Sequence, residues 1–163
     1  MTLKEVLVGR SPVRSLIRGL SLGALLLLGS QFLLTPVRAH GISMVPTYAE
    51  GQLLWVNRLA YRFGRPIRRG DILAITLKSG NAVLVKRAIG LPGERIRIER
   101  GQVYIDDQRL DEPYCVYRLP WNVAEARLGP DEIYVIGDNR SMNERFHDFG
   151  RADESRILGK VIN

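Results

Sequence analysis

The sequence predicts a mainly β domain, either a sandwich or a barrel, behind one N-terminal transmembrane helix. The first observation is a single run without charged residues at positions 19–37. Its length is close to the roughly 20 residues that cross a bilayer as a helix. The second observation is that many short apolar segments follow it, separated by turn residues, a pattern typical of β-sandwiches and barrels.

The apolar run divides the 163-residue chain into three parts. We expect a cytoplasmic basic tail at residues 1–18, a transmembrane anchor at 19–38 and an extracytoplasmic domain at 39–163, because positive charge before such a run keeps the N-terminus inside. A cleavable signal peptide is the alternative. Val37-Arg38-Ala39 places small residues at the two positions that signal-peptide cleavage requires. In both interpretations the domain at residues 39–163 lies outside the cytoplasm.

Charge and cysteine content exclude several classes of function. The net charge is +7, but residues 1–38 hold five Lys and Arg against one Glu, so the domain itself is only mildly basic. Its basic residues are scattered among acids, which argues against a nucleic-acid partner. The single cysteine, Cys115, excludes an internal disulfide and a Cys-rich zinc site. We expect neither a metal nor a cofactor.

The domain's elements follow from short apolar runs and the turns between them. Residues 57–69 are predicted to be a basic, irregular connector, and residues 106–122 a polar, mixed segment. Gly70-Asp71 and Ser79-Gly80-Asn81 predict turns, and Arg100-Gly101 predicts a hairpin. The predicted strands are residues 53–56, 72–75, 82–89, 95–98, 103–105, 133–136 and 157–162.

Ser43 lies just beyond the apolar run, in Gly41-Ile42-Ser43-Met44-Val45-Pro46-Thr47. Pro46 stiffens this stretch and biases Val45 toward an extended conformation. A serine held rigidly at a membrane surface is a candidate nucleophile, although a helix cap or a turn residue is the alternative. A hydroxyl becomes a good nucleophile only when a neighbouring group accepts its proton.

Lys86 is the strongest candidate for that base, because a lysine is costly to bury in an apolar strand. Strand alternation places Lys86 on one face with Leu84 and Ala88, while Arg87 lies on the other face. Burial and the nearby positive charge both favour the neutral amine, which can accept a proton from a serine. Lys86 at a strand edge with its amine in solvent is the alternative.

A second alternative for the base is histidine. A Ser-His-Asp arrangement with His147 and either Asp148 or Asp138 stays open at the level of sequence.

Four segments in this order resemble the boxes of the type I signal peptidase family. They are residues 43–47, 69–72, 86–94 and 137–140, and they lie behind one N-terminal anchor, as in that family. The resemblance covers nearly the whole chain. The residues that carry it, besides the serine and the lysine, are Pro46, Asp71, Arg87, Gly137, Asp138, Asn139 and Arg140.

The resemblance implies a membrane-anchored serine endopeptidase with a mainly β, signal-peptidase-like catalytic domain. Its implied partners are the lipid bilayer and exported preproteins with small residues at the first and third positions before the cut. By matching position, Ser43 is the nucleophile, Lys86 the general base, and the backbone N–H of Ser43 part of the oxyanion hole. Some members add a serine hydroxyl two residues earlier, where this chain has Gly41.

The last box departs from the family pattern after Arg140. The family's serine, aspartate and arginine positions hold Asn143, Arg145 and His147. Because an amide both donates and accepts, we expect Asn143 to orient Lys86 in place of that serine.

The pockets for the small residues before the cut are expected around Met44, Val85 and Ile136. Self-cleavage at Val37-Arg38-Ala39 stays open. So does a catalytically weak or inactive, membrane-anchored binding protein of the same fold. A self-cleaving Ser–Lys repressor would need an N-terminal DNA-binding domain, which residues 1–40 cannot form.

Overall fold

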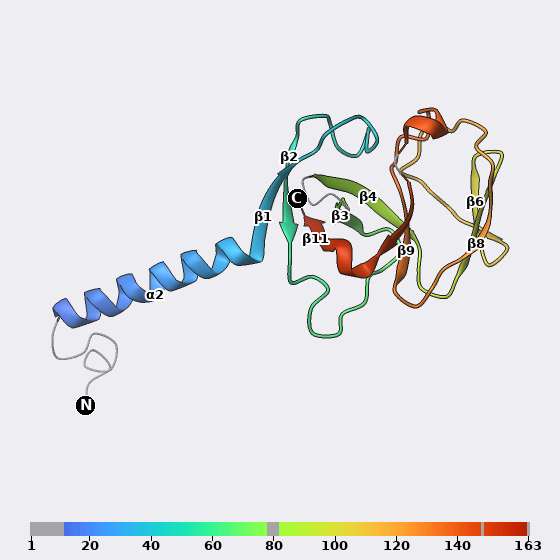
Figure 1. The fold of residues 1–163 in the computed structure, drawn as a ribbon. Helices are drawn as coiled ribbons and strands as arrows, with labels where there is room; N and C mark the ends of the chain where they lie inside the picture. The colour runs from blue at the N-terminus through green and yellow to red at the C-terminus, as the bar shows by residue number, and fades with distance from the viewer. Residues whose placement is uncertain (1–11, 78–81, 148, 163) are drawn as a thin grey trace. The chain divides into compact units, whose positions relative to one another are not determined.

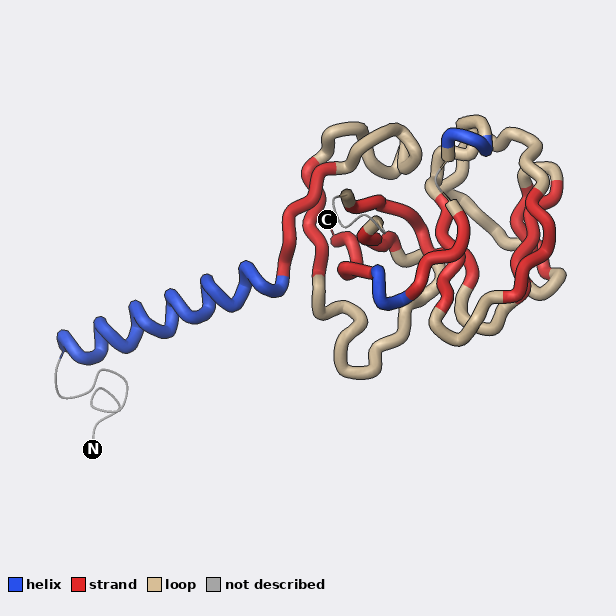
Figure 2. The backbone as a smooth tube through the Cα atoms, viewed as in Figure 1, coloured by secondary structure: helices blue, strands red, loops and turns tan. Residues whose placement is uncertain are grey.

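The computed structural model describes residues 12–77, 82–147 and 149–162. Helix α2 spans Pro12–Leu33, and residues 36–163 form a compact unit of strands and loops (Figures 1 and 2). The strands are β1 (Leu34–Arg38), β2 (Leu53–Asn57), β3 (Ile72–Thr76), β4 (Val83–Gly90), β5 (Arg95–Glu99), β6 (Gln102–Ile105), β7 (Gln108–Arg109), β8 (Val123–Arg127), β9 (Glu132–Ile136), β10 (Gly150–Asp153) and β11 (Ile157–Ile162). Two 3₁₀ turns, η1 (Glu144–Phe146) and η2 (Glu154–Arg156), flank β10.

The strands form two sheets, and β4 lies near the centre of the larger one. The seven-stranded sheet has the order β1-β2-β11-β3-β4-β9-β10, and the four-stranded sheet has the order β7-β6-β5-β8. The smaller sheet lies at the opposite end of the domain from β1 and β2 (Figure 1). A mainly β domain, as the sequence predicts, is therefore confirmed.

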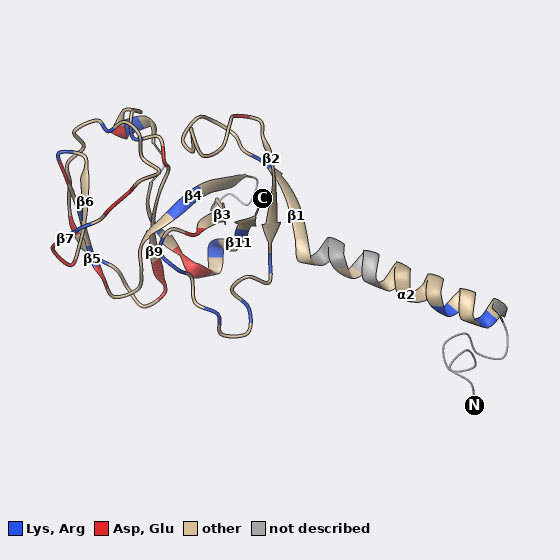
Figure 3. Ribbon diagram, turned by 180° about the vertical axis from the view of Figure 1, so that it is seen from behind, with Lys and Arg blue, Asp and Glu red and all other residues tan. Residues whose placement is uncertain are grey.

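Alternation along β4 separates the two faces of the larger sheet. Val83 and Val85 pack in one hydrophobic cluster together with Met44, whereas Leu84 and Ala88 pack in another. This confirms the predicted alternation of these side chains. A third cluster, built around Trp121, fills the space toward the smaller sheet. Basic and acidic residues are interspersed along the strands and loops (Figure 3).

The strong strand predictions are confirmed, and weaker strands were missed. The hairpin at Arg100-Gly101 is present, with both residues at positive φ and β5 paired to β6. The missed strand β8 reads Val-Ala-Glu-Ala-Arg, lies at the edge of its sheet and has no buried residue. The missed strand β10 buries only Ala152. Short edge strands of this kind carry little hydrophobic pattern. The predicted turn at residues 79–81 lies outside the described residues.

The predicted helical segment 19–38 has different bounds in the structure. Helix α2 begins at Pro12 and ends at Leu33, and residues 34–38 form β1 beside β2 instead. The reason is Pro36, which has no N–H to donate and disfavours helical backbone at the preceding residue. The predicted tail at 1–18 lies mostly outside the described residues.

Within the described ranges, no helix combines the length and the apolar character that crossing a membrane requires.

Candidate active site

The turn that carries Ser43 is held by the segment that follows β9. The backbone N–H of Asn139 donates to the carbonyl oxygen of Ser43 at 2.9 Å, and the Asn139 side-chain amide donates to the carbonyl oxygen of Ile42 at 3.0 Å. Gly137 permits this approach, because a Cβ at that position would lie 2.3 Å from the Ser43 carbonyl oxygen. The position of Ser43 thus depends on two segments that are far apart in the sequence.

Lys86 reaches Ser43 from the middle of β4, opposite Leu73 of β3. Its side chain is buried, with 2% of the residue exposed, and Nζ donates a hydrogen bond to Ser43 Oγ at 2.8 Å. Burial penalises the charged form of an amine. The arrangement therefore has the contact that a lysine needs in order to accept the proton of a serine hydroxyl.

His147 is a buried imidazole close to this pair. Burial first, and then the positive charges of Lys86 and Arg140, lower the pKa of His147 to about 3, so the ring is neutral at physiological pH. Its Nε2 accepts the backbone N–H of Gly137 at 2.8 Å, which leaves the ring proton on Nδ1. The ring also packs edge-on against Trp121, with 4.9 Å between centroids.

This geometry weakens the alternative in which a histidine is the base. Nε2 of His147 is occupied by Gly137, and a protonated Nδ1 has no lone pair with which to accept a proton. Of the two carboxylates considered for such a triad, Asp138 is bound to Arg87, and Asp148 lies outside the described residues.

The ion pair between Arg87 and Asp138, together with its hydrogen-bond partners, connects all four boxes. Arg87 Nε donates to Asp138 Oδ1 at 2.8 Å, and Nη2 donates to Oδ2 at 2.6 Å. The Thr47 hydroxyl donates to the same carboxylate, and Arg87 Nη1 donates to the carbonyl oxygen of Gly70 at 2.8 Å. Asp138 is 1% exposed. Because one carboxylate binds the residue after Lys86 and a residue of the Ser43 turn, it fixes the two segments relative to each other.

Asp71 stabilises the domain at a different place. Its carboxylate accepts from the Tyr61 hydroxyl at 3.0 Å, from the Arg68 backbone N–H at 3.1 Å and from Lys160 Nζ at 2.5 Å. These contacts attach the connector before β3 to β11. Asp71 therefore joins two parts of the fold through its side chain.

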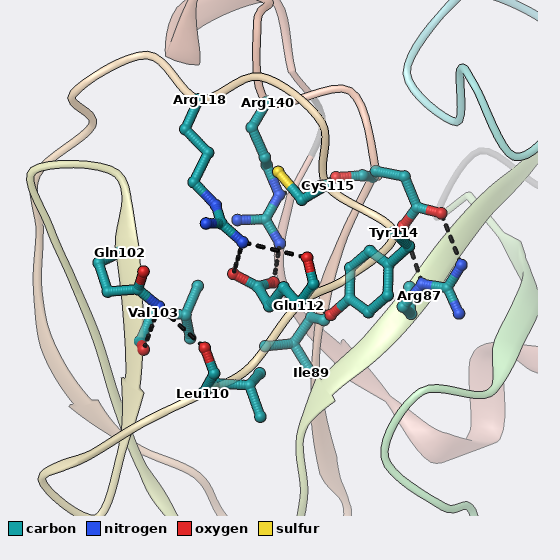
Figure 4. Close-up of polar contacts among 12 residues, drawn as sticks. Arg87, Ile89, Gln102, Val103, Leu110, Glu112, Tyr114, Cys115, Arg118 and Arg140 are labelled. Carbon is teal, nitrogen blue, oxygen red and sulfur yellow. Dashed lines mark hydrogen bonds and ion pairs between the residues drawn. The ribbon is translucent and has the colours of Figure 1, made fainter.

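The structure also contains a buried cluster behind the Arg87–Asp138 pair that the sequence does not predict (Figure 4). At its centre, the Glu112 side chain is fully buried and accepts from Arg140 Nη2 at 2.5 Å and from the Tyr114 hydroxyl at 3.0 Å. Arg140 Nε also donates to the carbonyl oxygen of Gly137 at 2.9 Å, and the Arg87 guanidinium lies 4.0 Å from the centre of the Tyr114 ring. One acid within a polar segment gives no periodic signal, so nothing in residues 106–122 distinguished Glu112.

Two positions predicted to assist the dyad lie in unexpected settings. Gly41 is exposed and has a φ of +79°, a conformation in which a serine would be strained. Asn143 is exposed, and its side-chain oxygen accepts the backbone N–H of Arg145 at 3.0 Å, at the start of η1. The structure thus brings His147 toward Lys86 and directs Asn143 to a local turn.

The three positions predicted to line the substrate pockets fall into two groups. Met44 and Val85 pack in the same cluster, with 3% and 8% of each residue exposed. Ile136 is fully buried in the cluster around Trp121. Met44 and Val85, which adjoin Ser43 and Lys86 in the sequence, therefore pack together, whereas Ile136 packs in a different cluster.

Comparison with known proteins identifies the family. The family described as signal peptidase, peptidase S26, matches residues 13–163. Signal peptidase I of Bacillus caldolyticus is 36% identical over 136 residues, which cover 75% of this chain and 74% of that protein. Signal peptidase IB of Staphylococcus aureus (strain Mu50) is 28% identical over 155 residues, covering 84% and 80%.

Among solved structures, a signal peptidase I from Enterococcus faecalis V583 superposes with a TM-score of 0.46 at 23% identity, over 59% of this chain and 97% of that chain. The family match extends over almost the whole described chain, and the two relatives match most of its length. The chain therefore belongs to the signal peptidase family, peptidase S26, and is a serine-type peptidase that cleaves signal peptides.

Proposed function

We propose that Ser43 is the nucleophile and Lys86 the general base of this signal peptidase. The observation that carries the proposal is the 2.8 Å contact between Lys86 Nζ and Ser43 Oγ at a buried lysine. In the reactive form the amine is neutral and the serine hydroxyl donates to it. Motif position and geometry agree on the same two residues.

The reaction follows from these two groups. Lys86 takes the proton of Ser43 Oγ as the oxygen attacks the scissile carbonyl carbon, which gives a tetrahedral oxyanion and an ammonium. The ammonium then protonates the leaving amine, and the C–N bond breaks to leave the signal peptide esterified to Ser43. A water molecule, deprotonated by Lys86, hydrolyses the ester and regenerates the enzyme.

The backbone N–H of Ser43 is our candidate donor to the oxyanion. In enzymes of this type the loss of one such donor costs about 3 kcal/mol of transition-state stabilisation. Gly41 offers no hydroxyl for this purpose, and its positive φ shows why a side chain is disfavoured there. The hydrogen bonds from the Asn139 backbone and side chain to the Ser43 and Ile42 carbonyl oxygens fix the Ser43 turn and so preorganise the donor.

We further propose that Met44 and Val85 limit the size of the residues accepted before the cut. Both are nearly buried and adjacent in sequence to Ser43 and Lys86. A tightly packed wall of this kind admits small side chains and excludes larger ones. Preproteins with small residues at the first and third positions before the cut are the substrates we expect.

The proposed location is the cell membrane, with the N-terminus in the cytoplasm and the catalytic domain outside. The support is the sequence, which has no charged residue from Gly19 to Val37, and the described leucines of α2, of which Leu20 and Leu25 are 66% and 67% exposed. We propose that the segment is retained. Cleavage after Ala39, which is 5% exposed, would detach β1 from its sheet.

The test of the catalytic proposal is cleavage of a preprotein by the wild type and by Ser43→Ala and Lys86→Ala. We expect the wild type to release the signal peptide and both variants to retain less than about one thousandth of its kcat/KM. Circular dichroism and thermal unfolding establish that the variants are folded. Substantial activity in either folded variant rules out the dyad, and substrate binding without turnover by the wild type supports the inactive binding protein instead.

A further inference from the structure

A small pocket lies beside the Ser43 turn, and nothing in the reaction described above uses it. It has a volume of about 200 Å³, below the roughly 300–1,000 Å³ of sites for drug-sized ligands, so it suits a single side chain. We name it the Tyr117 pocket. Its walls include Val45, Pro46, Val116, Tyr117, Asn139 and Ser141.

The pocket is connected to the nucleophile through the backbone. Val45 and Pro46 follow Ser43 by two and three residues, and Asn139 binds the carbonyl oxygens of Ile42 and Ser43. The cluster that contains Met44 and Val85 shares no residue with the pocket. Met44 and Val45 thus direct their side chains to different sides of the turn. The substrate residue that fits this pocket is therefore not one of the residues before the cut, which we expect at Met44.

The chemistry of the walls selects an apolar side chain. Val116 and Tyr117 are 62% and 73% exposed, far more than apolar residues of the core. The one carboxylate in the wall, Asp138, is bound to Arg87 and Thr47, so its charge is already compensated. An apolar side chain that binds against these residues is stabilised because both apolar surfaces leave water.

The wall that carries Tyr117 is anchored to the protein interior. Leu119 N–H donates to the carbonyl oxygen of Arg140 at 2.9 Å, and Arg118 pairs with Glu112 at 3.5 Å. Cys115 Sγ donates to the carbonyl oxygen of Tyr117 at 3.5 Å. Figure 4 shows Cys115, Arg118 and Arg140 gathered around Glu112. Because Arg140 also binds Gly137, the same buried cluster fixes both the pocket wall and the segment that holds Ser43.

We propose that the Tyr117 pocket binds the side chain of one of the first two residues after the cut, at the N-terminus of the mature protein, and that it favours apolar and aromatic residues there. The proposal rests on Ser43 as the nucleophile. Ser43 attacks the bond that is cut, so its position determines where the residues before and after the cut lie. It adds a preference after the cut to the preference for small residues before it.

The experiment measures kcat/KM for preproteins that are identical before the cut and carry Leu, Phe, Ser or Asp at the first or second position after it. For the wild type we expect Leu or Phe at one of these positions to exceed Ser and Asp by about tenfold, the effect of one side chain in an apolar pocket. In Tyr117→Ala the preference falls to about twofold, and cleavage of the Ser preprotein is unchanged. Phe63→Ala, which removes an 89% exposed ring that does not line the pocket, keeps the wild-type preference.

A binding measurement separates this proposal from the catalytic one. Fluorescence anisotropy of a labelled peptide that spans the cut is measured with Ser43→Ala, alone and combined with Tyr117→Ala. We expect the Leu peptide to bind about tenfold more weakly when Tyr117 is absent, and the Ser peptide to bind equally well to both. If peptide binding depends on Tyr117 but the wild type cleaves no preprotein, the catalytic proposal is wrong and the pocket proposal stands. Cleavage or binding whose preference after the cut does not change in folded Tyr117→Ala overturns the pocket proposal alone.

Discussion

The two halves of the segment after β9 differ in what their side chains contact. In residues 137–140, Gly137 and Asn139 contact the backbone of the Ser43 turn, Asp138 binds Arg87, and Arg140 binds the buried Glu112. In residues 143–147, only His147 is buried. The half that matches the family pattern is therefore the half that holds the proposed active site together.

The departures from the family pattern are concentrated in the second half, where the structure tolerates them. Asn143 and Arg145 are exposed, so other side chains at these positions would not disturb the packing of the interior. His147 is the exception. Where the sequence resemblance expects an arginine, it presents a neutral ring that accepts one backbone hydrogen bond next to Lys86 and Arg140. We therefore expect substitutions in residues 137–140 to reduce stability and activity strongly. A substitution of His147 should have an intermediate, pH-dependent effect on stability, and a substitution of Asn143 should have a small effect on both.

Asp138→Asn should cause the largest loss of stability and activity among these three substitutions. It leaves the half-buried Arg87 guanidinium without its counter-ion, and breaking a buried pair in this way typically costs about 3–5 kcal/mol of unfolding free energy. We also expect kcat/KM to fall about 100-fold, because the Ser43 and Lys86 segments lose their shared anchor. Denaturant unfolding and the preprotein assay measure the two effects. The matched control is Asp107→Asn, because the exposed ion pair of Asp107 with Arg95 at 2.8 Å should contribute at most about 1 kcal/mol. Equal losses of unfolding free energy in the two variants would show that the buried Asp138 pair is no more important than an exposed one.

His147→Gln should change how stability depends on pH. The pKa of His147 is lowered from 6.5 to about 3 in the folded protein, so between these values the unfolded chain binds a proton that the folded chain does not. The stability that this residue contributes is therefore complete above pH 6.5 and declines as the pH falls, by about 2 kcal/mol at pH 5.

Denaturant unfolding at pH 7, 6 and 5 measures this decline. We expect it in the wild type, we expect glutamine at position 147 to abolish it, and we expect it to persist in His40→Gln, which alters an exposed histidine. Lys86 and Arg140 are the charged groups that bear on His147 in the folded state. An identical decline in the wild type and in His147→Gln would show that His147 is not the titrating group.

Asn143→Ala should have the smallest effect. The side chain caps η1 through Arg145 N–H, and loss of such a cap costs about 0.5–1 kcal/mol. We expect kcat/KM to stay within about twofold of the wild type. A loss of tenfold or more would mean that Asn143 orients Lys86, as the sequence resemblance suggested.

The fold was predictable where apolar runs were long or alternated, and not elsewhere. β4, the hairpin of β5 and β6, and β11 all carry such patterns, and all were predicted. β8 and β10 lie at sheet edges and bury little, so their sequences resemble loops. The strand at residues 34–38 was assigned to the apolar helix because composition alone does not show where pairing with β2 begins.

The candidate site was predictable to the extent that short motifs encode it. Ser43, Lys86 and Asp138 stand in local patterns, and the structure joins Ser43 to Lys86 and Asp138 to Arg87. Glu112 and the neutral state of His147 depend on tertiary contacts, namely burial against Arg140 and acceptance of the Gly137 N–H. No spacing in the sequence encodes such contacts, which is why the cluster behind Arg87 was not anticipated.

The central claim is that Ser43 and Lys86 act as one catalytic unit, and a double-mutant comparison tests it most directly. Residues that act as a unit have strongly non-additive effects on catalysis. We measure kcat/KM for preprotein cleavage with Ser43→Ala, Lys86→Ala and the double variant, all confirmed to be folded. We expect kcat/KM to fall on the order of 10⁴–10⁶-fold in each single variant, and the double variant to lie no more than about threefold below them. If the losses of kcat/KM in the single variants multiply in the double variant, or if Lys86→Ala keeps a tenth of the wild-type kcat/KM, then Ser43 and Lys86 do not act as one catalytic unit.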